Sequence, residues 1–326
     1  MPAFYDTIIP IMLGGIYRSL LVFSICLLPG VVKADIFPLD DALRATYTAC
    51  VGIDDELADL KKMAGINTAI TAVGTATGTG ATVVGLVKAS KDKEVEVKLE
   101  KLREIEQRNP DMDSSDDEWD SFSANMQSQL EEAKKEIEKY KDEIEKLTKQ
   151  SKSLGNWRTG LMAGNTATNV AGAIIAGTNK VDGDLKTQID NCISNVKTLQ
   201  NSIMQARING EDVSEAESIA SACGEYEYVD VSKINNRAKG AMISSAVGAA
   251  TGLAGTVTSA TANSNKIRNA QGDAAQQKEK NLNTASNVLA GASTVASATA
   301  TVFNATQISA IKKVAAVAEK CTGLLK

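Results

Sequence analysis

The stretch AGINTAITAVGTATGTGATVVGLV, residues 64–87, decides the fold of this chain. It contains no charged residue. Apolar or small residues recur in it in alternating steps of three and four, at Ile66, Ile70, Val73, Thr77, Gly80, Val84 and Val87. This spacing lines one face of an α-helix. We therefore expect a helix here, with Ala, Gly and Thr at the interfaces where it packs on its neighbours.

Segments of this kind occur in an order that is repeated along the chain. The first pass consists of Cys50, uncharged residues 64–87, charged residues 88–152, uncharged residues 159–179 and Cys192. The second consists of Cys223, uncharged residues 240–265, charged residues 266–280, uncharged residues 281–311 and Cys321. Residues 72–78 also match residues 246–252 in sequence. We interpret the order as a diverged duplication, with helical hairpin units at 35–210 and 211–326. The alternative is that helices rich in Ala, Gly and Thr resemble one another in composition alone.

The longer charged segment has the strongest periodicity in the chain. A heptad runs through Met126, Leu130, Ala133, Ile137, Tyr140, Ile144, Leu147, Ser151 and Leu154. A matching apolar stripe precedes it at Val95, Leu99, Leu102 and Ile105. Together these stripes predict a coiled coil over about residues 91–154 in the first unit.

The turn of this coiled coil is expected near Asn109-Pro110-Asp111, followed by an acidic tip. Asp116, Asp117, Trp119 and Phe122 are candidate interaction residues there. An exposed aromatic residue beside carboxylates is typical of a surface that binds a partner. The alternative is a hydrophobic plug that closes the end of the hairpin.

Composition favours helices throughout the 326 residues. Aromatic residues make up only 4% of the chain and prolines number five, so the apolar inventory consists mainly of Ala, Val, Ile and Leu. These side chains suit helices that approach closely. We predict an all-α fold: an elongated helical bundle of two related helical hairpins, with a coiled-coil extension in the first.

The absence of histidine limits the chemistry that is available. Ser-His-Asp and Cys-His catalytic arrangements and histidine-based zinc sites are excluded. The acidic residues lie mostly in helical charge runs, where a solvated face explains them. We therefore expect no enzyme, catalytic residue, metal, cofactor or small-molecule substrate. The formal net charge of −5 offers no basic footprint for nucleic acid.

The N-terminal region is typical of an export signal. Arg18 precedes the apolar stretch 19–32, and Val32-Lys33-Ala34 provides a cleavage site. We expect residues 1–34 to be a signal peptide and the mature chain to be periplasmic or extracellular. Translation from Met12 instead of Met1 would give a more conventional signal. A retained membrane anchor is the alternative to cleavage.

Removal of the signal leaves four cysteines in a compartment that permits oxidation. Three connectivities exist for four cysteines. If each unit closes on itself, Cys50 pairs with Cys192 and Cys223 pairs with Cys321. The second arrangement joins Cys192 to Cys223 and Cys50 to Cys321. The alternative to any disulfide is that the cysteines are buried free thiols.

Glycines four residues apart recur in the uncharged segments. The pairs are Gly74 with Gly78, Gly160 with Gly164, and Gly248 with Gly252. This spacing lets helix backbones approach closely and is a packing signal in membrane helices. The same segments are rich in Thr, Ser and Asn and poor in Leu and Phe. We therefore favour a water-soluble bundle over a membrane-inserted one.

These observations predict an exported, non-enzymatic structural or interaction protein. Its working parts would be the tip and the coiled-coil flanks, with a protein partner or self-association. The alternative function is a membrane-active, pore-forming-like helical protein whose soluble bundle opens and inserts its helices rich in Gly, Ala and Thr into a bilayer.

Overall fold

All described residues form an all-helical structure. A computed structural model describes residues 39–108, 124–268 and 272–325. Every regular element within these ranges is a helix, which confirms the all-α prediction. The expected signal peptide, the expected turn at residues 109–111 and the tip residues Asp116, Asp117, Trp119 and Phe122 lie outside the described residues.

The elements follow one another with short connections. They are α1 (Leu39–Cys50), α2 (Ile53–Arg108), α3 (Ala124–Thr178), α4 (Gly183–Ile208), α5 (Ser214–Gly224), the 3-10 helix η3 (Glu225–Tyr228), α6 (Ser232–Ala262), α7 (Asn265–Arg268) and α8 (Asp273–Leu325). Gly52, with φ at 92°, makes the break between α1 and α2, because only glycine adopts this conformation readily. Asp182 caps α4 by accepting a hydrogen bond from the Leu185 amide.

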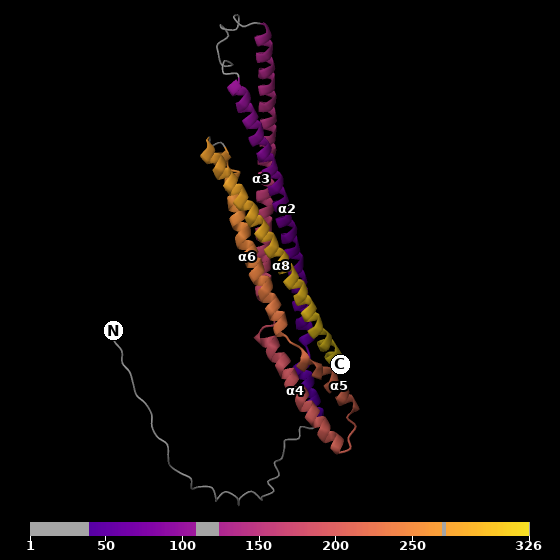
Figure 1. Cartoon of the computed structure of the whole chain (residues 1–326). Coiled ribbons are helices and arrows are strands. Elements are labelled where there is room, and N and C mark those ends of the chain that lie inside the picture. Colours follow the sequence, from indigo (N-terminus) through magenta and orange to yellow (C-terminus); the bar gives the residue numbers. More distant parts are fainter. Residues whose placement is uncertain (1–38, 109–123, 269–271, 326) are drawn as a thin grey trace, which may run out of the picture.

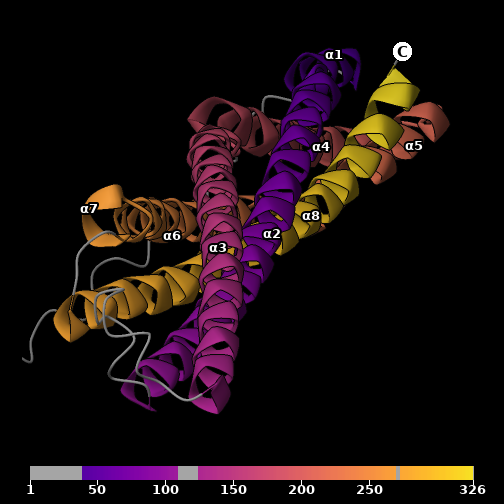
Figure 2. The same cartoon turned by 90° about the horizontal axis from the view of Figure 1, so that it is seen from above.

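The four long helices form one bundle. Helix α2 packs against α3 and α8, and α6 packs against the same two helices. Helices α2 and α3 continue beyond the ends of α6 and α8 as a two-helix rod (Figure 1). Helix α8 runs obliquely across α2 (Figure 2). The two expected units are therefore packed on each other along the shared section.

The apolar core lies at the end of the bundle opposite the rod, in a region we call the base. Helices α1 and α5 pack against α4 and the end of α8 there, and α4 also contacts α2 (Figure 2). Its buried residues include Leu57, Ile189, Leu199, Ile234 and Ile311. Large aliphatic side chains thus stabilise the base. The bundle between the base and the rod has a different interior.

Candidate functional site

The uncharged part of the bundle, which we call the middle section, is the candidate functional site. It comprises residues 64–87 of α2, 159–178 of α3, 240–262 of α6 and 282–310 of α8. No Asp, Glu, Lys or Arg occurs in any of these four segments. About 24 residues at 1.5 Å per residue give this section a height of about 36 Å.

The interior of the middle section contains many polar side chains beside buried alanines. Its buried polar residues are Asn67, Thr71, Asn165, Asn169, Ser245, Ser259, Ser286, Ser293, Ser297, Asn304 and Gln307. Met162 with Ala81 and Ala290 forms a small apolar cluster among them. Buried polar groups require hydrogen-bond partners.

Most of the partners lie on neighbouring helices. Asn165 Nδ2 donates to Ser293 Oγ at 2.8 Å, and Asn169 Nδ2 donates to Ser297 Oγ at 2.8 Å. These bonds join α3 to α8. Ser293 Oγ donates to the carbonyl oxygen of Gly248 at 2.7 Å, which adds α6.

A second layer joins α2 to α8 nearer the base. Asn67 Nδ2 donates to Asn304 Oδ1 at 2.9 Å, and Asn304 Nδ2 donates to Thr71 Oγ1 at 3.3 Å. Gln307 Nε2 donates to the carbonyl oxygen of Asn179 at 2.7 Å. The hydrogen bonds therefore connect all four helices along the section.

The outer face of the middle section is apolar. We call this surface the belt. Its exposed large side chains are Ile66, Val73, Val83, Leu86, Val87, Val170, Ile174, Ile243, Val247, Leu253, Val257, Val288, Val295 and Val302. All four helices contribute to it, and Ala and Thr occupy most of the remaining outward positions. The section thus buries Asn, Ser and Thr beside alanines and exposes its larger apolar side chains, which is unusual for a water-soluble bundle.

The periodic apolar residues of segment 64–87 are not its buried face. Ile66, Val73 and Val87 of the stripe are 43%, 54% and 44% exposed. Asn67 and Thr71 are buried instead. Small and polar residues repeat with the same spacing as the apolar ones, so periodicity alone did not decide which face packs. Close approach of the backbones selects the small residues.

Four of the expected packing glycines lie against neighbouring side chains. A Cβ on Gly74 would be 2.7 Å from Thr168 Oγ1, and one on Gly78 would be 2.5 Å from Thr294 Oγ1. A Cβ on Gly248 would be 2.6 Å from Asn169 Oδ1, and one on Gly252 would be 2.7 Å from Thr166 Oγ1. These distances are too short for real carbon contacts, so the positions exclude larger residues.

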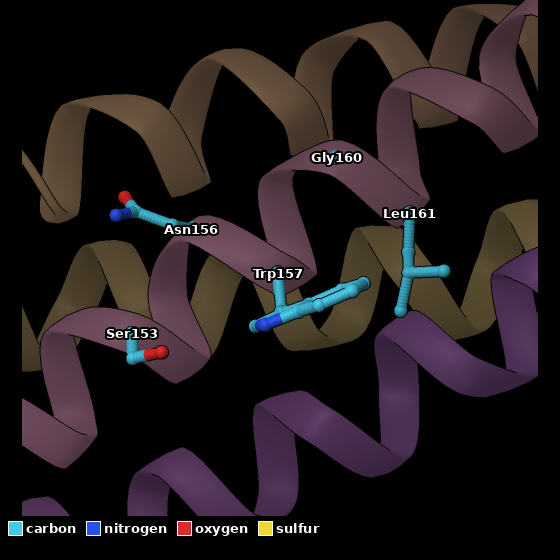
Figure 3. A pocket seen from close by; sticks show the side chains of 5 residues that line it. All are labelled: Ser153, Asn156, Trp157, Gly160 and Leu161. Carbon is cyan, nitrogen blue, oxygen red and sulfur yellow. The ribbon is translucent and has the colours of Figure 1, made fainter.

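The packing role expected of Gly160 and Gly164 is wrong. A Cβ at either position would meet nothing within 4 Å. Gly160 instead lines a shallow hollow of about 450 Å³ with Ser153, Asn156, Trp157 and Leu161 (Figure 3). Trp157 is 68% exposed. Gly85, Gly172 and Gly255 make close contacts that the four-residue spacing did not reveal.

Three of the four bundle helices fit the dimensions of a bilayer. The merged helical stretches Leu39–Ile105, Ser214–Ala262 and Ala274–Leu325 each contain an 18-residue window apolar enough to cross a membrane. Only 28%, 28% and 33% of the residues in these windows are buried. The hydrocarbon core of a bilayer is about 30 Å thick, which the middle section exceeds slightly. Helix α3 does not reach the same hydropathy.

Charged residues directly follow the uncharged segments where the middle section meets the rod. Lys88 is 1% exposed, and its Nζ lies 2.5 Å from Asp92 Oδ2 and 3.7 Å from Glu279 Oε1. Further out, Lys98 of α2 forms an ion pair with Glu143 of α3. Their hydrogen bond raises the pKa of Lys98 and lowers the pKa of Glu143.

The four cysteines lie together in the base. Cys50 is bonded to Cys192 and Cys223 to Cys321, with Cα–Cα distances of 4.8 and 4.6 Å. All four are fully buried. The sulfurs of Cys50, Cys223 and Cys321 lie within 4.8 Å of one another. Because each is in a disulfide, none is a thiolate that could bind a metal ion.

Comparisons with protein-family models, with curated proteins and with solved structures gave no significant match to this chain. Function is therefore inferred from the geometry of the middle section, the rod and the base.

Proposed function

We propose that this protein is an exported, non-enzymatic membrane scaffold. The middle section lies in the bilayer, and the rod and the base project from its two sides. This proposal combines the interaction function expected from the sequence with the membrane location that was expected only as the alternative.

The belt is the observation that carries the proposal. A soluble bundle of this height would need charged side chains at its outward positions, and the belt has Val, Ile, Leu, Ala and Thr there on all four helices. Apolar surface that continues over all four helices is typical of a face that lipid or another protein covers. Interior hydrogen bonds between Asn, Ser and Thr are typical of associated membrane helices.

Both edges of the middle section support this location. Lys61, Lys62, Lys180, Arg237, Lys239, Lys312 and Lys313 border it on the side of the base. Lys91, Lys152, Lys266, Lys278 and Lys280 border it on the side of the rod. Long basic side chains at such edges reach the lipid headgroups, and Trp157 lies at the rod edge, where tryptophan is favoured.

The disulfides orient the molecule. Disulfides persist in oxidising compartments, so the base belongs on the exported side of the membrane. Helix α2 leads from the base into the rod, and α3 returns (Figure 1). The rod then lies on the opposite side. We interpret it as the coiled coil expected from the heptad, and its charged flanks as the surface offered to a protein partner.

The test of membrane location is flotation with lipid vesicles. Full-length protein reconstituted into phosphatidylcholine–phosphatidylglycerol vesicles should float with them and resist extraction at alkaline pH. Leu253→Lys with Val295→Lys places two charges in the belt and should abolish flotation, because each charge at the bilayer centre costs about 2.5–3.5 kcal/mol. Ile208→Lys is the matched control, since Ile208 is exposed in the base.

Two results of this experiment would contradict parts of the proposal. A wild-type protein that stays soluble without lipid or detergent contradicts membrane location. A defined oligomer in light scattering would then show that further copies of this chain cover the belt. A monomer in water would contradict both readings of the belt.

The polar interior favours a second candidate, permeabilisation of the bilayer. The hydrogen-bonded Asn and Ser side chains would line a path if the four helices separated. Close contacts at Gly74, Gly78, Gly248 and Gly252 keep that interior closed in the structure. Dye release from vesicles on addition of the protein tests this function, and absence of release over a range of pH and lipid charge contradicts it.

A further inference from the structure

The two disulfides of the base lie against each other. One joins Cys50 of α1 to Cys192 of α4, and the other joins Cys223 of α5 to Cys321 of α8. The sulfurs of Cys50, Cys223 and Cys321 lie within 4.8 Å of one another, and Cys192 lies outside this trio. Cys50 is therefore the member of the first disulfide that is placed to react with the second.

The chain segments around the trio are joined by further contacts. Asp54, four residues after Cys50, accepts a hydrogen bond at 3.3 Å from the hydroxyl of Thr322, which follows Cys321 on α8. Tyr226 of η3 is 0% exposed, and its pKa is raised by burial and by the charge of the nearby Asp54. The start of α2, η3 and the end of α8 thus meet at the cysteines.

The surroundings of the trio favour a reaction within the protein. All four cysteines are 0% exposed and belong to the apolar cluster of the base, with Ile53 and Leu57 among its other members. A thiolate that forms at Cys50 has the second disulfide as its neighbour. Two groups held in this way react far faster than the same groups in solution.

We propose that the base is a thiol–disulfide relay, in which Cys50 passes electrons from a dithiol reductant to the Cys223–Cys321 disulfide. The reductant first opens the Cys50–Cys192 disulfide: its two thiols are oxidised to a disulfide, and both cysteines become thiols. Deprotonated Cys50 then attacks Cys223 or Cys321. A disulfide to Cys50 forms, the Cys223–Cys321 bond breaks, and the other sulfur of that pair leaves as a thiolate. This thiolate takes up the proton that Cys50 lost.

The exchange changes which helices are covalently joined. Before it, one disulfide holds α1 to α4 and the other holds α5 to α8. After it, α1 is joined to α5 or α8, and the disulfide that fastened α4 is gone. Packing alone then holds α4 in the base. The base therefore responds to a reductant by moving a cross-link and releasing α4.

Removal of Cys192 isolates the second step. Cys26→Ser leaves no thiol outside the cluster, because the chain has five cysteines. In that background, Cys192→Ser leaves Cys50 as a thiol beside the Cys223–Cys321 disulfide. Protein in a nonionic detergent is incubated at mildly alkaline pH, acid stops the exchange, and free thiols are labelled in denaturant before peptide mapping. With three equally stable pairings, Cys50 should be disulfide-bonded in about two thirds of the molecules.

Cys50→Ser in the same background is the matched control. It removes the same disulfide, but the thiol that remains is Cys192, which lies outside the trio. We expect the label at Cys192 and an intact Cys223–Cys321 disulfide in nearly all molecules.

A chain with all four cysteines of the cluster tests the complete relay. Treatment of the Cys26→Ser protein with less than one equivalent of dithiothreitol should give molecules in which Cys50 is joined to Cys223 or Cys321. Cys192 should carry the label in those molecules. Without a relay, mapping would find only native disulfides and cysteine pairs that are both reduced.

Three outcomes would overturn the proposal. One is a Cys192→Ser variant in which every Cys50 is labelled. Another is a Cys50→Ser variant that exchanges as readily, because opening of the base would then explain the reaction. The third is a dithiothreitol experiment without any disulfide to Cys50 other than the native one, and this experiment decides alone if the variants do not fold. The three experiments do not depend on membrane location, because a protein that proves soluble is tested in the same way in buffer.

Discussion

At the scale of single residues, small and polar side chains determine how closely the helices pack. The sequence indicated the importance of glycines four apart, and Gly78 and Gly252 lie against neighbouring side chains. The same spacing failed at Gly160 and Gly164, which face open space. Spacing identifies a narrow helix face, but only the position of the neighbouring helix shows whether anything packs there.

Two glycine substitutions should have opposite effects. Gly78→Ala brings a methyl group to 2.5 Å from Thr294 Oγ1, so we expect a loss of about 1–3 kcal/mol of stability from overpacking. Gly160→Ala meets no neighbour and should gain up to about 1 kcal/mol from helix propensity. Thermal unfolding of both variants in detergent checks the signs, and a destabilised Gly160→Ala variant would contradict the placement of α3.

Truncation of a buried asparagine should also be costly. Asn169→Ala removes hydrogen bonds to Asn165 Oδ1 and Ser297 Oγ, each at 2.8 Å. Partners left unsatisfied in the interior cost about 1–3 kcal/mol. Asn195→Ala is the control, because Asn195 is only partly buried on α4 and its Nδ2 donates to the carbonyl oxygen of Asn191 in the same helix. Equal melting temperatures for the two variants would count against the polar interior.

At the scale of elements, the sequence predicted helices well and their orientation less well. The heptad placed Leu147 and Ser151 inward, and both are buried. Tyr140 of the same heptad lies under Lys98 Nζ, 5.5 Å from the ring centre. In residues 64–87 the apolar residues Ile66, Val73 and Val87 lie outward, and Asn67 and Thr71 are buried. Hydropathy predicts which helix face avoids water. That face can be covered by lipid as well as by the protein core.

The ion pair of the rod should make its stability depend on pH. The pKa of Glu143 is lowered by its hydrogen bond to Lys98, so its contribution is complete above the unfolded value of about 4.3 and is lost as pH falls through the folded pKa. The pKa of Lys98 is raised. The ion pair therefore stabilises the rod up to about pH 10. This stabilisation is lost at higher pH, as the pH rises through the raised pKa of folded Lys98.

Measurement of wild type against Glu143→Gln tests this dependence. Their unfolding midpoints should differ at pH 7 and converge only as the pH falls through the lowered pKa of folded Glu143. Exposed Glu131→Gln is the control. A difference that persists unchanged at low pH would mean that packing, not the ion pair, accounts for the effect.

The disulfides of the base close long segments of chain. Their sequence separations are 142 and 98 residues. Loops of this length give a chain-entropy stabilisation of about 4–5 kcal/mol for each disulfide. We expect Cys50→Ser with Cys192→Ser to lower the unfolding midpoint of the base markedly, and non-reducing peptide mapping should still find Cys223 joined to Cys321. Mapping of the wild type to any other pairing would contradict the structure of the base.

At the scale of the whole molecule, the account depends on what surrounds the middle section. Composition predicted an all-helical chain, and the repeated order predicted which segments would be helices. Neither could show that Asn, Ser and Thr from four distant segments meet inside one bundle, because this depends on contacts between residues as far apart as Asn67 and Asn304. Once those side chains lie inside, the valines must lie outside.

The accessibility of spin labels tests the central claim most directly. Labels are attached at Val247 and Val295 in the belt and at Ile208 in the base, through single introduced cysteines in protein reconstituted into vesicles. We predict that the belt labels collide freely with oxygen and are shielded from a water-soluble nickel chelate, while the label at Ile208 shows the reverse. Belt labels as accessible to the chelate as the label at Ile208 would contradict a membrane location for the middle section.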